Sequence, residues 1–143
     1  MAAYDYVEPG EGKSYDWKAD HIFVKATMAA TGDRVTVVED ALKPGFALAR
    51  HFHKVMTEVF YVLDGRVTFV FDDATVVAEQ GGTLTIPPGT WHAVSSDGAV
   101  MITVFAPGGF EGYLAELASL DAGSFEDEGL QRALAERYDT WTE

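Results

Sequence analysis

Short runs of β-type sequence fill the chain from residue 21 to about residue 105. Val, Ile, Thr, Phe and Tyr dominate these runs, and clusters of Gly, Pro, Asp or Ser separate them at short intervals. In order, the runs are HIFVKATM, RVTVVEDAL, FALARHFH, EVFYVL, RVTFVFD, TVVAE, TLTIP, HAVSS and AVMITVFA. Such regular punctuation is typical of an antiparallel sandwich or barrel. The pattern therefore predicts an all-β barrel over residues 21–106.

The two ends of the chain follow other patterns. The first twenty residues mix Tyr, Asp, Glu, Pro and Gly without a period, which predicts an irregular arm over residues 1–20. Beyond Pro107 the apolar residues fall at helical spacing. They form two stripes, Phe110, Leu114, Leu117 and Leu120, then Leu130, Leu134 and Tyr138, with a break over residues 121–129. Residues 107–143 are therefore predicted to be an extension of one or two helices that packs against the barrel or a second subunit.

Two stretches predict turns. Asp64-Gly65 lies between two β-type runs and favours a two-residue hairpin, because both positions tolerate the positive φ angles of a type I′ turn. Pro87-Pro88-Gly89 cannot lie in the middle of a central strand, so we expect a turn or a sheet edge there.

Three of the four histidines combine with a glutamate in one pattern. His51 and His53 share one face of a strand because side chains alternate with period two. After an expected turn over residues 54–57, Glu58 opens the next strand alongside, and His92 follows the proline turn. Three imidazoles and one carboxylate on rigid strands predict a single transition-metal site with positions left open for water, dioxygen or substrate.

These residues carry a resemblance to the cupin family that spans about residues 21–106. The first cupin motif is matched at Gly45, His51, His53, Glu58 and Gly65, and the second at Gly81, Pro87, Gly89 and His92. The chain departs from the second motif at Ser96, where an asparagine is common, and at Gly82, where an acidic residue is common. The resemblance implies a double-sheet jelly-roll barrel, followed here by one or two C-terminal helices. It also implies one divalent metal ion held by His51, His53, Glu58 and His92.

The ligand set leaves the metal and the reaction open. Fe, Mn, Co, Ni and Zn suit it about equally, and its net positive charge would favour an enolate or phenolate ligand. Small cupins that resemble quercetin dioxygenase use this set, which implies that Glu58 is both metal ligand and general base. We therefore expect a dioxygenase acting on a phenolic or enolic small molecule. The alternatives are a non-redox polyketide cyclase or isomerase, and a binding module without catalysis.

Residues for a substrate pocket are harder to select. Phe60 shares the strand parity of Glu58, and Phe60, Val94 and Thr103 are expected to line the pocket. Trp91 has the opposite parity to His92, which favours the core or a subunit interface. His21 lies outside both motifs and is expected to be a surface or hydrogen-bonded histidine. Along the last strand Thr103 shares a face with Met101, but the sequence leaves open which face is inward.

The composition of the chain disfavours some classes of binding partner and of site. The 143 residues carry 10 basic and 23 acidic side chains, a net charge of −13, which disfavours nucleic acid and anionic membranes as partners. The absence of cysteine excludes disulfides and thiolate zinc sites. We see no signal-peptide pattern and no run of about 18 apolar residues, so we expect a soluble, cytoplasmic protein. The apolar outward-parity residues Val59, Tyr61 and Leu63 favour a homodimer, unless the C-terminal helices cover them.

Overall fold

The computed structural model describes residues 3–143, most of which lie in antiparallel strands followed by a helical extension. The strands are β1 (Ser14–Asp16), β2 (Asp20–Ala26), β3 (Thr36–Leu42), β4 (Phe46–Phe52), β5 (Thr57–Phe71), β6 (Thr75–Glu79), β7 (Thr83–Ile86), β8 (His92–Ser96), β9 (Ala99–Ala106) and β10 (Trp141–Thr142). The helices are η1 (Ala29–Thr31), a 3-10 turn, and α1 (Phe110–Ser119), α2 (Ala122–Phe125) and α3 (Glu128–Arg137).

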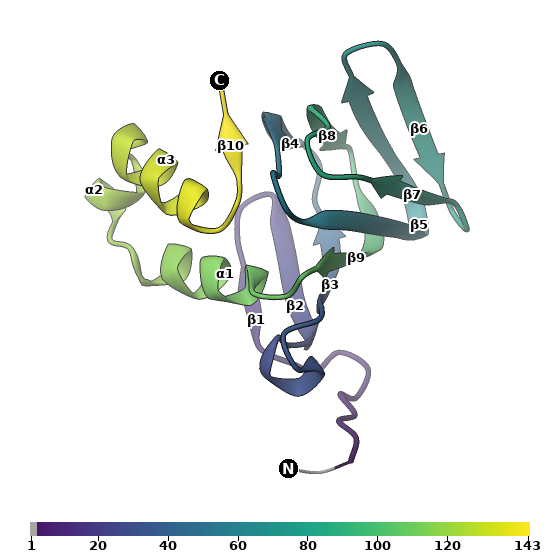
Figure 1. Cartoon of the computed structure of the whole chain (residues 1–143). Coiled ribbons are helices and arrows are strands. Elements are labelled where there is room, and N and C mark those ends of the chain that lie inside the picture. Colours follow the sequence, from purple (N-terminus) through teal and green to yellow (C-terminus); the bar gives the residue numbers. More distant parts are fainter. Residues whose placement is uncertain (1–2) are drawn as a thin grey trace.

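The strands form two antiparallel sheets that share β5 (Figure 1). One sheet has the order β1-β2-β3-β9-β5-β7 and uses the first part of β5. The other contains β10, β4 and β8 next to the second part of β5, whose opposite edge pairs with β6. This arrangement confirms the predicted all-β, cupin-type jelly-roll architecture.

The hairpin predicted at Asp64-Gly65 is wrong, because the long strand β5 continues through these residues. The strand does not turn back there, and its pairing with β9 only shifts register between Val62 and Asp64. Gly65 has φ +77°, and a Cβ on it would lie 2.6 Å from the carbonyl oxygen of Gly98. The positive φ and the close approach of two backbones both require glycine. The glycine therefore serves a bulge at which β5 passes from one sheet to the other.

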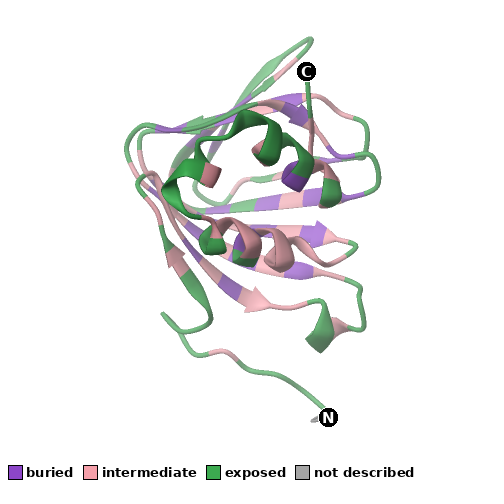
Figure 2. Cartoon of the chain, turned by 90° about the vertical axis from the view of Figure 1, so that its left-hand side faces the viewer, coloured by how far each residue is buried: buried purple, intermediate pink, exposed green. Residues whose placement is uncertain are grey.

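Alternation along the strands places the core between the sheets. In β3 and β9 every second residue is buried, and Figure 2 shows this alternation along the ribbons. Met101, Thr103 and Phe105 occupy the inner face of β9, which decides the orientation that the sequence left open. Phe60 and Phe69, both on β5, pack their rings 4.9 Å apart inside the barrel.

The C-terminal extension contains more structure than predicted. The expected break at 121–129 holds the short helix α2, and Asp121 and Asp127 cap the N-termini of α2 and α3 by accepting backbone N–H bonds. After α3 the chain returns to the barrel, where β10 pairs with β4 (Figure 1). At the other end, β1 lies within the arm that the sequence predicted to be irregular. No helix within residues 3–143 has the length and apolar character to cross a membrane.

The helices leave the outer face of β5 uncovered. Tyr61 and Leu63 are 43% and 41% exposed, whereas Val59 is half-buried. For Tyr61 and Leu63, packing beneath the C-terminal helices is therefore wrong.

Candidate metal centre

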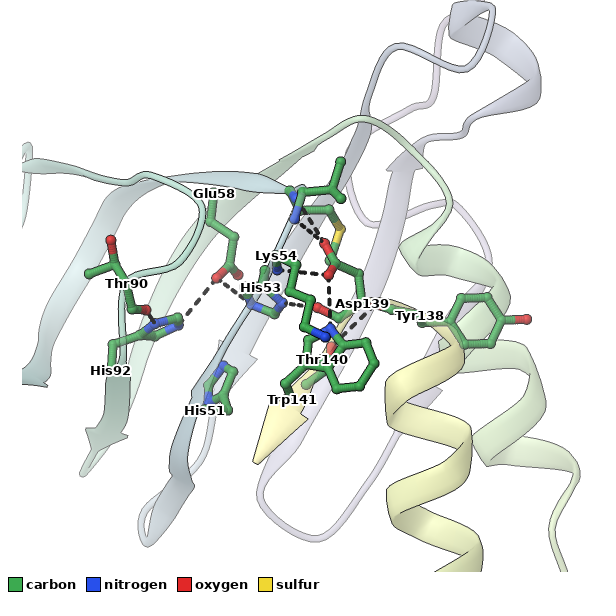
Figure 3. A network of polar contacts seen from close by, with 12 residues as sticks. His51, His53, Lys54, Glu58, Thr90, His92, Tyr138, Asp139, Thr140 and Trp141 are labelled. Carbon is green, nitrogen blue, oxygen red and sulfur yellow. Dashed lines mark hydrogen bonds and ion pairs between the residues drawn. The ribbon is translucent and has the colours of Figure 1, made fainter. Parts of the chain in front are cut away.

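The four side chains selected from the sequence meet at one point. One ligand atom from each of His51, His53, Glu58 and His92 lies within 4.8 Å of all the others, and all four residues are buried (Figure 3). His51 lies in β4 and His53 directly after it, Glu58 is the second residue of β5, and His92 begins β8. The juxtaposition of the four groups agrees with the predicted ligand set.

One detail of the predicted arrangement is wrong. The sequence placed Glu58 on a strand directly alongside the strand of His51, but β4 pairs with β8 and β10 and not with β5. His51 instead lies opposite His92 across the β4–β8 ladder, with ring centroids 4.2 Å apart. Glu58 reaches the same point from the other sheet, where it is opposite Phe105. The site therefore bridges the two sheets.

Each imidazole is oriented by a backbone carbonyl. The Nδ1 atoms of His51 and His92 lie 2.8 and 2.9 Å from the carbonyl oxygens of Ala49 and Thr90, two residues earlier in the chain. Nδ1 of His53 lies 2.8 Å from the carbonyl oxygen of Asp139, which is far away in the sequence. A carbonyl only accepts, so each Nδ1 carries a proton, and in the neutral ring each Nε2 presents a lone pair.

Acceptor atoms converge where the Nε2 lone pairs point. Glu58 Oε1 lies 2.8 Å from His53 Nε2 and 3.3 Å from His92 Nε2, and these three buried atoms have no hydrogen-bond partner in the Nδ1–H tautomer. Buried acceptors that face one another are unfavourable unless a proton or a cation lies among them. Imidazole nitrogen and carboxylate oxygen are ligands that first-row divalent metals accept. The donor set therefore fits a divalent metal ion.

The charges of these groups depend on one another. Burial lowers the pKa of His51 to about 4, which leaves this imidazole neutral at pH 7. Burial acts in the same sense on His53, but its hydrogen bond with Glu58 outweighs burial and raises the pKa. Burial alone would raise the pKa of Glu58, yet the hydrogen bonds with His53 and His92 hold it at about 2. Glu58 is thus an anion at pH 7.

The other histidine and Trp91 lie outside the cluster. His21 stacks on Phe23 and lies 3.9 Å from a carboxylate oxygen of Asp16, in agreement with the expected non-ligand role. The Trp91 ring packs against Phe52 at an interplanar angle of 55° and lies beneath the guanidinium of Arg50, away from the four ligand candidates.

The three residues expected to line a substrate pocket all face the interior. Phe60 and Val94 are buried in the main hydrophobic cluster. Thr103 lies opposite Phe60 across the β5–β9 ladder and donates a hydrogen bond to a carboxylate oxygen of Asp40 at 3.1 Å. Their role as substrate contacts stays a prediction.

A buried acidic pair was not singled out in the sequence. Asp40 projects inward from β3 and lies at hydrogen-bonding distance from Asp20. Burial, followed by the charge and hydrogen bond of Asp20, raises the pKa of Asp40 well above its usual value. Burial also raises the pKa of Asp20. The sequence could have indicated this group, because Asp40 shares the inward parity of Val38 and Leu42.

These observations define an all-β barrel protein with a candidate mononuclear metal centre between its sheets. Residues 38–106 match the family model described as a cupin domain. This match contains both cupin motifs, so residues 38–106 form a cupin domain.

Two curated proteins are related to the chain. A quercetin 2,3-dioxygenase of Bacillus subtilis is 30% identical over 99 residues, which are 68% of this chain and 29% of that protein. An uncharacterized protein of Methanocaldococcus jannaschii is 27% identical over 73 residues, which are 51% of this chain and 58% of that protein. The chain thus spans less than two thirds of either relative.

Several solved structures share the fold. KdgF from a Halomonas species has a TM-score of 0.65 at 15% identity, over 75% of this chain and 98% of its own. An RmlC-like cupin from Shewanella frigidimarina has a TM-score of 0.62 at 17% identity, over 75% and 92% of the two chains. Pac13 of Streptomyces, described as a nucleoside dehydratase, has a TM-score of 0.61 at 21% identity, over 74% and 83%. At such identities the likeness concerns the fold alone.

Proposed function

We propose that this cupin is a mononuclear divalent-metal enzyme, and that it acts as a dioxygenase on a phenolic or enolic small molecule. The observation that carries the proposal is the convergence of three Nε2 lone pairs and one carboxylate in a buried site. The relationship to a quercetin 2,3-dioxygenase supports the choice of reaction. His51, His53, Glu58 and His92 would hold the metal, with Fe, Mn, Ni, Co and Zn all compatible with the ligand types.

A metal held by these four residues would supply a Lewis acid for a phenol or enol hydroxyl, which would lower the pKa of that hydroxyl, and open positions for dioxygen. The three histidines stay neutral ligands because their Nδ1 protons are held by carbonyl oxygens. Glu58 would accept the substrate hydroxyl proton. An ionised carboxylate is a weak base toward an unassisted phenol, so proton transfer to Glu58 requires a substrate hydroxyl whose own pKa is strongly lowered.

The inner face of the barrel would then select the substrate. Phe60 and Val94 offer apolar contacts, and a planar aromatic substrate fits such surroundings better than a flexible polar one. Thr103 adds one polar group on the same sheet as Glu58.

A second candidate is a non-redox reaction, such as the cyclisation or isomerisation of an enolisable substrate. The inward carboxyl of Asp40 favours it, because burial raises the pKa of this group and Thr103 holds it in place, and such a group could return a proton to a substrate carbon or leaving group. In this case the metal acts only as a Lewis acid.

Oxygen dependence separates the two reactions. The protein would be purified without air, its metal content measured, and the metal-free protein reloaded with each divalent ion. Dioxygen uptake with a flavonol or a catechol supports the dioxygenase. Full turnover of an enolisable substrate without oxygen would contradict it and favour the second candidate. His53→Ala should lose the metal, and His21→Ala is the matched control that should keep it.

A further inference from the structure

A carboxylate from the C-terminal segment lies against the turn between two of the candidate ligands (Figure 3). Oδ1 of Asp139 accepts the backbone N–H of Lys54 at 2.7 Å, and Oδ2 accepts those of Val55 and Met56 at 2.9 and 2.8 Å. Oδ1 also accepts the indole N–H of Trp141 at 3.1 Å. One side chain thus satisfies three successive backbone donors, which an exposed turn would leave to water.

The clamped turn links two ligands. His53 immediately precedes Lys54, and Glu58 comes two residues after Met56. Fixing three amides of so short a connection restricts the position of both ligands. The peptide of His53 is held from a further side, because its carbonyl oxygen accepts the N–H of Gly89 at 2.7 Å.

The backbone of Asp139 contacts a ligand directly. Its carbonyl oxygen lies 2.8 Å from His53 Nδ1, whereas His51 and His92 use carbonyls two residues earlier in their own segments. Among the three imidazoles, that of His53 is therefore oriented by the C-terminal segment. Asp139 has φ +57°, a left-handed conformation that aspartate tolerates better than most side chains.

Several contacts hold this segment in place. Trp141 of β10 lies opposite Phe52 of β4, so β10 is anchored beside the histidine strand. The Lys54 ammonium lies 3.4 Å from the centre of the Trp141 ring. Burial would raise the pKa of Asp139, but the backbone N–H groups of residues 54–56 outweigh it and lower the pKa. The carboxylate is therefore charged when it clamps the turn.

From this geometry we infer that Asp139 is a positioning residue of the metal centre. Its carboxylate fixes the turn between His53 and Glu58, and its carbonyl keeps His53 in the tautomer whose Nε2 faces the other ligands. The inference rests on the proposed metal binding, and it makes the C-terminal extension part of the site. Outer groups of this kind typically change metal affinity by about 10–100-fold when removed.

The test compares two variants at this position. Asp139→Gly keeps the left-handed backbone and removes all four acceptor contacts of the carboxylate. Asp139→Asn keeps the shape and one acceptor oxygen but loses the charge. In competition with a chelator, we expect the affinity for Zn(II) and Co(II) to fall by about 10–100-fold in Asp139→Gly and by less in Asp139→Asn. Asp127→Ala removes the N-cap of α3 and is the matched control, expected to keep wild-type affinity.

A second measurement needs no metal. Nitrogen-15 NMR of the histidine rings in the metal-free protein should show a hydrogen-bonded Nδ1 proton on His53 in the wild type, and a weakened hydrogen bond in Asp139→Gly. An unchanged affinity together with an unchanged His53 hydrogen bond in a folded Asp139→Gly would overturn the inference. If the wild type itself bound neither ion, the proposed function would fail instead. Circular dichroism identifies a variant that has not folded, in which case Asp139→Asn decides.

Discussion

Glu58 Oε1 stands between His53 Nε2 and His92 Nε2, at 2.8 and 3.3 Å, and it reaches these histidines of the β4–β8 sheet from the opposite sheet of the barrel. Because a single carboxylate oxygen faces both imidazoles, Glu58 supplies the negative charge of a site that otherwise contains only neutral donors. The sheets would be linked through this group whenever a cation is bound.

Glu58→Gln tests this charge. The amide is close in size to the carboxylate, but it is a neutral and weaker ligand. We expect the affinity for Zn(II) or Co(II) to fall by more than the roughly 10–100-fold that the loss of an outer contact causes. Isothermal titration against the wild type measures the change. Glu39→Gln, which removes the same charge on the outer parity of β3, is the control, and equal affinities for the two variants would contradict the role of Glu58.

Asp40 should make stability fall with increasing pH. Its pKa is raised in the folded state, where burial and the neighbouring Asp20 disfavour ionisation. The folded protein therefore binds this proton more tightly than the unfolded chain does. The resulting stabilisation is fully present below the unfolded-state pKa of about 4, and it is lost as the pH rises through the folded-state pKa.

Asp40→Asn removes this dependence, because an amide stays neutral at every pH and can still donate to Asp20. We expect the variant and the wild type to have similar stability near pH 3. At pH 7 the variant should have the larger free energy of unfolding. The expected difference is about 1.4 kcal/mol for each unit by which folding raises the pKa of Asp40, counted no further than pH 7. Urea unfolding at several pH values measures the difference. Asp20, Thr103 and Glu58 surround Asp40, and a stability difference that does not change with pH would contradict the assignment to the titration of Asp40.

The sequence predicted the parts of the structure that depend on local period. Alternation along the strand placed His51 and His53 on one face and Phe60 with Glu58. The path of β5 could not be read in this way, because Asp-Gly fits both a hairpin and a bulge, and pairing with the distant β9 decides between them. The contact between Asp139 and His53 spans 86 residues and has no local signal. Asp40 could have been found from its parity among apolar neighbours.

Gly65, at the bulge of β5, and Gly81 offer a matched pair of substitutions. Gly65→Ala would adopt φ +77° and bring its Cβ to 2.6 Å from the carbonyl oxygen of Gly98. Gly81→Ala has a similar φ of +83° but meets nothing within 4 Å. Backbone strain costs about 1–3 kcal/mol in both variants, and only Gly65→Ala adds a steric clash between two backbones. We expect a clearly larger loss of unfolding free energy for Gly65→Ala, as measured by urea denaturation, and equal losses would contradict the bulge interpretation.

The outer face of β5 carries the prediction of a homodimer. Tyr61 and Leu63 are exposed apolar residues that the helices leave uncovered, and pairing with a second copy would bury them. If a two-fold interface forms there, Leu63→Glu places two like charges near each other, which costs several kcal/mol. Sedimentation velocity should therefore show a dimer for the wild type and a monomer for Leu63→Glu.

Val77→Glu is the matched control for this experiment, because Val77 is similarly exposed but lies on β6, beside the other part of β5. It adds the same charge to a chain whose net charge is already −13, so any general repulsion between subunits appears in both variants. Dissociation by Leu63→Glu alone places the interface at Tyr61 and Leu63. A wild-type protein that stays monomeric at high concentration would contradict the dimer. The exposed side chains of Tyr61 and Leu63 would then be available for a different partner.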